Sequence, residues 1–588
     1  MSLPVRVRSA VCFAMLGLLA SQVIAQDRNS PRHSASLLPE STVLYAELPD
    51  LAGLVDAVEK HPLTRKVYEL DQYKQALQDP KYAMFQVVLK TIEGKLGMTW
   101  KEGIAALTKG GICLGFSPEE NGAVLIIRAK DAASLDKIRN TFFELARGEA
   151  ARQGQPDPIE EQEYRGQKVY KAGEAKFATL DDRLILASND KLGKAVLDRY
   201  LDGKGSSLET NPRWNDAKSL LKTNPTAWAW LDVQKLRDLG AAKPLFQEKS
   251  DNPVLELLLG GLSGTLRNTP FVVGTLEFDV ERIAVSLKSP HRAEWVDESR
   301  TYSVGADGRA QSPPLLEPEQ TVLSIGAYRD FSEMWLNASN LYVDKIDDGI
   351  SQANANLSTL FGGKDFGEDI LGSFQPGFRF VAARQTYAED RPIPSIKVPS
   401  FAFVMEFKEE QTAAPAFRRM YQNLIGFLNI VGGMNGNPQM ELETETIGDT
   451  KINSATFIPD DREDLAAASI HFNFSPTITN VGNLFVIASS RELAIDLAHD
   501  LNQSPSADRK TANTQIKVGL TVLTEILNDN RSHLVSQNML SEGRSREEAE
   551  QQIGLLLEGL SLLNDFQFRL NLSESDASIG VELRFRQD

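Results

Sequence analysis

The sequence predicts an α+β protein built from two similar tandem domains, each an antiparallel sheet with helices packed mainly on one face. Three observations predict this class. Similar segments recur in the same order in the two halves of the chain, and apolar runs of strand length stand in pairs around tight-turn residues. Segments with apolar residues three and four apart follow those pairs, as in helices. Strands joined by tight turns pair antiparallel, and helices between hairpins cover a sheet.

The repeat is clearest where each half begins. "LLPESTVLYAELPDL" starts at Leu37, and "LLEPEQTVLSIGAYRDF" starts at Leu315. Four later blocks recur in the same order, and the last pairs "LLLGGLSGTLRN" in the first half with "LLLEGLSLLNDF" near the C-terminus. Five matches in one order indicate a tandem duplication, because chance similarity would not preserve the order.

These blocks define the expected organisation of the chain. The segment 289–314 is polar and contains several Gly and Pro residues, so it is predicted to be a linker. The prediction is a signal peptide (1–25), a flexible leader (26–36), a first repeat domain (37–288), the linker (289–314) and a second repeat domain (315–588).

Each repeat is predicted to open with a strand and a capped helix. Val43–Leu48 has the length and composition of a strand, and Asp50 can cap a helix whose apolar residues are Leu51, Leu54 and Val58. In the second repeat Asp330 takes the same place, and Glu333 stands three residues later as in a capping box.

Two hairpins are predicted to follow in the first repeat. Apolar runs at 112–116 and 124–129 flank Asn121-Gly122, a pair that favours the positive φ of a tight turn. The next segment places four apolar residues on one helix face, namely Leu135, Ile138, Phe142 and Leu145. The second hairpin turns at Asp181-Asp182.

The N-terminus predicts export to the periplasm or the cell surface. Arg6 and Arg8 precede an apolar run that ends at Ala25, and Val23 and Ala25 are small enough for signal-peptidase cleavage. An uncleaved membrane anchor is the alternative, although the run is short for a span. No later apolar run reaches about 18 residues, so no transmembrane segment is expected after cleavage.

Charge and cysteine content indicate which partners and which covalent links are unexpected for this chain. The chain has 63 Lys and Arg and 80 Asp and Glu, a net charge of −17, which argues against nucleic acid and anionic membrane surfaces as partners. Cleavage would remove Cys12 and leave Cys113, which lies in the apolar stretch "GICLGF". We predict a buried core thiol there and no intrachain disulfide.

Two stretches resemble a known family. "LLPESTVLYAELPDLAGLV" and "LGMTWKEGIAALTKGGICLGF" are similar to exported bacterial proteins known as a domain of unknown function, which open with an L-P-x-x-T-x-x-Y strand after a signal peptide. The resemblance spans most of both halves, and it implies export but no activity or catalytic residues. The second half departs from the pattern, because "LSIGAYRD" replaces "LYAELPD".

No catalytic, cofactor or metal site is predicted. The six histidines form no HxH or HxxxH pair, and "GGLSGT" around Ser263 lacks the G-x-S-x-G spacing. The candidate binding residues are Trp228 and Trp230, because residues two apart on a strand share a face and two indoles could form a platform for a ligand or partner. Packing of both indoles against a helix is the alternative.

Three functions stay open. The first is an exported, non-enzymatic envelope protein that binds or scaffolds a partner. The second is a periplasmic carrier of an apolar or lipid-like ligand held between helices and sheet, suggested by the leucine clusters at Leu257–Leu259 and Leu555–Leu557. The third is a hydrolase whose site is assembled from scattered residues.

Overall fold

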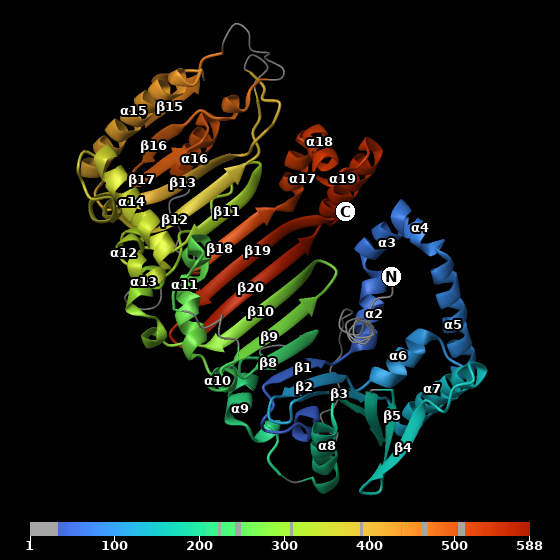
Figure 1. The fold of residues 1–588 in the computed structure, drawn as a ribbon. Coiled ribbons are helices and arrows are strands. Elements are labelled where there is room, and N and C mark those ends of the chain that lie inside the picture. The colour runs from blue at the N-terminus through green and yellow to red at the C-terminus, as the bar shows by residue number, and fades with distance from the viewer. Residues whose placement is uncertain are drawn as a thin grey trace. The chain divides into compact units, whose positions relative to one another are not determined.

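The computed structural model describes residues 33–587, apart from 174, 204, 222–224, 242–247, 306–309, 388–391, 437, 460–467 and 504–511. The predicted signal peptide lies outside the described residues. The chain divides into two compact units, the first made of Met1–Ala241 and Thr269–Ser289, the second of Ala242–Asn268 and Pro290–Asp588. Helices and antiparallel strands mix in both units, so the predicted α+β class is confirmed (Figure 1).

The first unit is built on an antiparallel sheet. Its described strands lie in the order β10 (Arg282–Pro290), β9 (Val272–Phe278), β8 (Ala227–Leu231), β1 (Leu44–Leu48), β2 (Ile112–Ser117), β3 (Gly122–Arg128), β7 (Arg183–Ala187), β6 (Ala175–Leu180), β5 (Gln167–Ala172) and β4 (Ile159–Tyr164). The two predicted turns are present, because Asn121 and Asp181 have φ values of 51° and 49°. Local turn chemistry therefore set both hairpins.

The second unit contains a sheet with the same order of strands. They are β20 (Asp576–Phe585), β19 (Leu563–Leu572), β18 (Thr514–Gly519), β11 (Thr321–Ala327), β12 (Phe374–Ala383), β13 (Ser400–Phe407), β17 (Leu484–Ala488), β16 (Thr477–Val481), β15 (Thr450–Phe457) and β14 (Met440–Ile447). Each strand has a counterpart at the same place in the first sheet.

Helices connect the strands in both units. The first unit has α2 (Leu51–Lys60), α3 (Pro62–Glu69), α4 (Asp71–Leu77), α5 (Pro80–Leu96), α6 (Trp100–Thr108), α7 (Ala132–Arg152), α8 (Asp190–Asp202), α9 (Pro212–Lys218) and α10 (Val233–Asp238). The second has α11 (Pro253–Asn268), α12 (Phe331–Leu336), α13 (Ala338–Leu341), α14 (Asp344–Leu360), α15 (Glu410–Met434), α16 (Arg491–Gln503), α17 (Leu520–Asp529), α18 (Arg531–Glu542) and α19 (Arg546–Ser561).

The predicted helix caps are present. The Asp50 carboxylate accepts a hydrogen bond from the Gly53 amide at 2.9 Å, and the Asp330 carboxylate accepts one from the Glu333 amide at 3.1 Å. Each side chain satisfies an amide that has no partner within the first turn of its helix.

Helices pack on both faces of each sheet, whereas the sequence predicted one main face. In the second unit, Leu493 and Leu497 of α16 pack on Ala402 and Val404, while Val522 and Leu523 of α17 pack on Leu323 and Phe380 of the opposite face. In the first unit, α8 covers the face of Val124 and Ile126, and α2 covers part of the other. The reason is that both alternating sets of strand residues are apolar, so both faces need cover.

The described end of the predicted flexible leader and two stretches of the predicted linker form 3₁₀ turns. Ser34–Leu37 at the end of the predicted leader forms the 3₁₀ turn η1, with Ala35 inside the core of the first unit. The predicted linker contains the 3₁₀ turns η4 (Ala293–Trp295) and η5 (Glu298–Ser303), and it packs in the second unit. The helix α11 also lies in the second unit, although the sequence places it in the first repeat.

Candidate functional site

The two tryptophans predicted as a platform belong to the core. Trp230 is fully buried, and the Trp214 ring of α9 lies 5.2 Å from that of Trp228 and 5.5 Å from that of Trp230. The indole N–H of Trp228 donates to Glu47 at 3.1 Å. The residues share a strand face as expected, but a helix covers that face, so they offer no surface platform.

Cys113 is a core thiol, as predicted. Its side chain is buried beside Tyr45, and burial raises the pKa of the thiol well above its ordinary value. The thiol therefore stays protonated and unreactive at neutral pH. Within the described ranges, no three His, Cys, Asp or Glu side chains gather as metal ligands would. None of the helices in the described part of the chain is long and apolar enough to span a membrane.

The strongest candidate for a functional surface is one face of the second sheet. Phe403 of β13 pairs with Ile487 of β17 and with Phe380 of β12, and side chains of directly paired residues project from the same face. The register continues this row across seven strands as Ile487, Phe403, Phe380, Ile325, Ile516, Phe568 and Val581. We call the face that carries this row the Phe403 face.

A second apolar row lies beside the first on the Phe403 face. Its members in register are Phe401, Ala382, Leu323, Val518, Phe566 and Leu583. Phe401, Phe403 and Ile487 are 40%, 38% and 37% exposed, and most of the other members are partly exposed. Both rows thus leave apolar surface open to solvent, which soluble domains usually bury.

Three helices of the second unit bound the Phe403 face. Leu523 of α17 packs near Leu323 and Phe380, and Phe417 of α15 lies 5.2 Å from the ring of Phe485. On the side of β19 and β20, Leu262 of α11 packs with Phe568 and Ile579. The open rows therefore lie between helices that already use the ends of the same face.

The first sheet is different at the equivalent place. Its corresponding row reads Leu186, Leu125, Leu114, Ala46, Ala229, Gly274 and Leu287. Three of these positions are Ala or Gly, whereas the row in the second sheet has three phenylalanines. The aromatic character of the Phe403 face is thus not required by the shared strand order.

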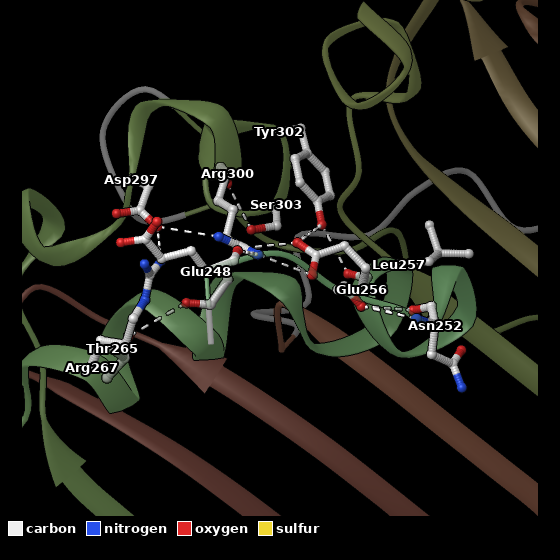
Figure 2. Close-up of polar contacts among 12 residues, drawn as sticks. Glu248, Asn252, Glu256, Leu257, Thr265, Arg267, Asp297, Arg300, Tyr302 and Ser303 are labelled. Atoms are coloured by element: carbon white, nitrogen blue, oxygen red, sulfur yellow. Dashed lines mark hydrogen bonds and ion pairs between the residues drawn. The ribbon is translucent and has the colours of Figure 1, made fainter. Parts of the chain in front are cut away.

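A buried ionic cluster holds α11 in place (Figure 2). Arg300 is 2% exposed, and its guanidinium donates to the Glu256 carboxylate at 2.8 and 3.2 Å and to the Glu248 carbonyl at 2.8 Å. The Tyr302 hydroxyl donates to the Glu256 carbonyl at 2.8 Å. Burial raises the pKa of Tyr302 well above its ordinary value, so the hydroxyl stays neutral and can donate. Each charge in the cluster therefore has a partner, as burial requires.

A fully buried arginine adds a second anchor for α11. Arg329 donates to the carbonyls of Leu257 and Leu258, the latter at 2.7 Å, and to Asn513 and Thr514 at 3.1 and 2.9 Å. These partners are uncharged oxygens. Burial lowers the pKa of Arg329 to about 10, so the side chain remains charged at neutral pH. It ties the middle of α11 to the start of β18.

Sequence reasoning missed the Phe403 face because register is not visible in a sequence. One local signal was present: "SFAFVMEF" has large apolar residues at 401, 403 and 405 and small ones at 402 and 404. That alternation predicts a strand with two different apolar faces. Only the pairing with distant strands assembles the full rows.

The comparisons with known proteins add no function. No family model matches the chain, and no curated protein matches it. The solved structures similar to it include crystal forms IV and I of TP0453, at 10% and 12% identity, each covering 44% of this chain and 79% of that chain with a TM-score of 0.23. A TM-score this low supports no functional argument.

Proposed function

We propose that this chain is an exported, non-enzymatic protein of the cell envelope, periplasmic or on the cell surface, that binds a partner protein through the Phe403 face. The observation that carries the proposal is the pair of partly exposed apolar rows on the second sheet. Fully burying one exposed Phe or Ile side chain contributes about 1.5–3 kcal/mol, and the most exposed members of the rows are 37–40% exposed. Covering each of these would therefore contribute about a third of that free energy, and several together would favour association. The N-terminal signal pattern and the family resemblance support export.

The size of the face favours a protein partner over a small ligand. Neighbouring strands lie about 4.8 Å apart, so a row across seven strands extends over roughly 29 Å. A face of this length is larger than the pockets that hold small ligands and is on the scale of a protein interface. Of the leucines that suggested a carrier, Leu557 packs among α17, α18 and α19, whereas Leu556 is exposed.

No geometry in the described residues favours the hydrolase. The Ser469 hydroxyl lies 2.9 Å from Nδ1 of His471, two residues away. In a Ser-His-Asp triad the serine hydroxyl is hydrogen-bonded to Nε2 of the histidine, and the aspartate accepts a hydrogen bond from Nδ1. This contact is therefore a local turn interaction and not a nucleophile with its base.

A photo-crosslinking experiment tests the proposed function. Phe403 is replaced by benzoylphenylalanine in the full chain, and cells that produce the protein are irradiated before the envelope fraction is analysed by mass spectrometry. We expect a covalent adduct to one defined protein, and we expect Phe403→Glu in the same chain to prevent co-purification of that protein without lowering the Tm. A charge on this exposed strand face opposes burial in an interface.

The control position is Phe85 on α5, another exposed apolar side chain, which lies in the first unit. Adducts from benzoylphenylalanine at position 85 but not at position 403 would indicate that α5 contacts the partner, and they would contradict the proposal. An adduct of a few hundred daltons at Phe403 would indicate an apolar small molecule, and the carrier would then replace the partner-binding protein.

A further inference from the structure

The first unit contains a polar cavity that the proposed function does not use. Its volume is about 400 Å³, near the lower end of the roughly 300–1,000 Å³ of small-molecule sites. Three cations and three carboxylates line it, namely Arg199, Arg213, Lys235, Glu40, Glu119 and Glu120. The lining comes from the loop before β1, the β2–β3 turn, α8, α10 and the start of α9.

Two guanidinium groups are fixed at the cavity wall by two of their nitrogens each. Arg213 donates through Nε and Nη2 to Asp232, which is fully buried, at 3.0 and 2.9 Å. Arg199 donates through Nε and Nη1 to the carbonyls of Ser206 and Ala195 at 2.9 and 2.8 Å. Among the described residues, no carboxylate forms an ion pair with Arg199. Each guanidinium therefore keeps donors that can face a ligand.

Asn211 adds a buried donor at the same wall. The residue is 4% exposed and lines the cavity, and its side-chain oxygen accepts from the Arg213 amide at 2.9 Å. Its Nδ2 amide donates to no acceptor in the described part of the chain and is not one of the buried polar atoms without a partner. This donor is therefore open to the cavity, where a ligand oxygen could accept from it.

The Glu120 carboxylate, a negative charge in the same cavity, is also held in place. The Ser41 hydroxyl donates to Oε2 of Glu120 at 2.7 Å, and the Ser117 hydroxyl donates to the same oxygen. Burial works against ionisation here, but these hydrogen bonds hold the pKa of Glu120 below its ordinary value. The Glu120 backbone and the nearby Lys191 also favour the ionised carboxylate, which lines the cavity. Glu40 is exposed at the rim and takes part in no ion pair with a described residue.

We infer that this cavity binds a small zwitterion with one carboxylate and one ammonium group, of the size of an amino acid or a dipeptide. The carboxylate would lie on Arg199, Arg213 and Asn211, because a guanidinium fork matches a carboxylate. The ammonium group would lie between Glu120 and Glu40. Equal numbers of cations and anions line the site, so a simple anion or cation would meet uncompensated like charges.

The carboxylates of the cavity do not match the acid pair of a glycosidase. A pair of carboxylates that cleaves a glycosidic bond needs one acid whose pKa is raised, so that it can donate a proton. Glu120 is instead held ionised by two hydroxyls, and Glu119 is paired with Lys235 at 2.6 Å. The inference is independent of the Phe403 face, which belongs to the other unit.

Calorimetric titration of the full chain with L-alanyl-L-alanine tests the inference. Two matched probes each lack one charge: the C-terminal amide of the dipeptide and its N-acetyl form. We expect the dipeptide to bind, and each blocked probe to bind about tenfold more weakly, because each loses charge-assisted hydrogen bonds. Equal affinity for all three probes, or no heat from the dipeptide at concentrations up to about 1 mM, would overturn it.

Two variants separate the ends of the site. Glu40→Gln removes a rim charge that no ion pair in the fold requires, and we expect about two- to fivefold weaker dipeptide binding. Glu69→Gln on the exposed surface of α3 is the matched control and should bind as the natural chain does. Arg199→Gln should weaken the dipeptide but leave the C-terminal amide unchanged. Unchanged dipeptide affinity in both site variants contradicts the assignment.

Discussion

At the residue scale, the most informative charges of this acidic chain are the buried ones. Glu256 and Arg300 are 4% and 2% exposed, and they lie beside the leucine cluster 257–259 and in the predicted polar linker. Removing two charges from water is costly, so such a pair persists only when both partners are fully hydrogen-bonded. Tyr302 and the Glu248 carbonyl complete that set (Figure 2).

The pair predicts a large stability loss when one partner is neutralised. Glu256→Gln leaves the Arg300 guanidinium buried without its counter-charge, and we expect about 3–5 kcal/mol lower free energy of unfolding. Urea unfolding followed by circular dichroism measures the effect. The control Glu298→Gln changes an exposed carboxylate in the same segment and should stay within about 0.5 kcal/mol. If both variants unfold at the same urea concentration, the ion pair does not hold the segment.

At the element scale, the same sequence block serves two different environments. "LLLGGLSG" lies in α11, and "LLLEGLSL" lies at the end of α19. The block in α11 has three glycines, at 260, 261 and 264, whereas the block in α19 has one, at 559. A Cβ on Gly261 would lie 2.5 Å from the Ser303 hydroxyl, and one on Gly264 would lie 3.0 Å from the Trp295 carbonyl. The glycines thus let α11 approach the segment 295–304 closely. Gly559, the counterpart of Gly261, has open space around it.

This difference predicts opposite effects of one substitution at two matched positions. Gly559→Ala should raise the free energy of unfolding by about 0.5–1 kcal/mol, because Ala favours a helix over Gly. Gly261→Ala gains the same propensity but forces α11 away from Ser303, and we expect a net loss of about 1–3 kcal/mol. Urea unfolding of both variants gives the comparison. A gain at both positions would show that α11 does not pack closely on that segment.

Elements that depend on neighbouring residues were predictable, and those that depend on distant ones were not. Asp50, Asn121 and Asp330 act through their own turns, so caps and hairpins follow from local chemistry. The Phe403 face depends on register between strands that are far apart in the chain. Trp228 and Trp230 illustrate the limit, because their shared face was predictable but its cover by Trp214 was not.

At the scale of the whole molecule, the two sheets have the same strand order. The tandem duplication stays a prediction from the sequence. The compact units differ from the predicted domains in two respects, because the predicted linker and α11 both belong to the second unit. The helix α11 precedes β9 and β10 of the first unit in the chain but packs in the second. No periodicity or composition could show this, because the partners of α11 are Arg300, Tyr302 and Arg329, which follow it in the chain.

The last prediction follows from that assignment. A chain covering residues 290–588 lacks α11, so Arg300 loses the Glu256 carboxylate and the Glu248 carbonyl, and Arg329 loses the carbonyls of Leu257 and Leu258. A chain covering 248–588 retains them. We expect the shorter chain to unfold at a lower urea concentration, because buried cations without partners are costly.

A synthetic peptide of residues 250–268 should restore the lost stability of the shorter chain. At about 100 times its Kd, a bound peptide contributes about 2.7 kcal/mol, which would raise the Tm by roughly 5 °C. The same peptide with Glu256→Gln should give a smaller shift, since it cannot pair with Arg300. If the chains 290–588 and 248–588 unfold at the same urea concentration and the peptide does not change the Tm of the shorter one, α11 belongs to the first repeat, as the sequence alone predicted.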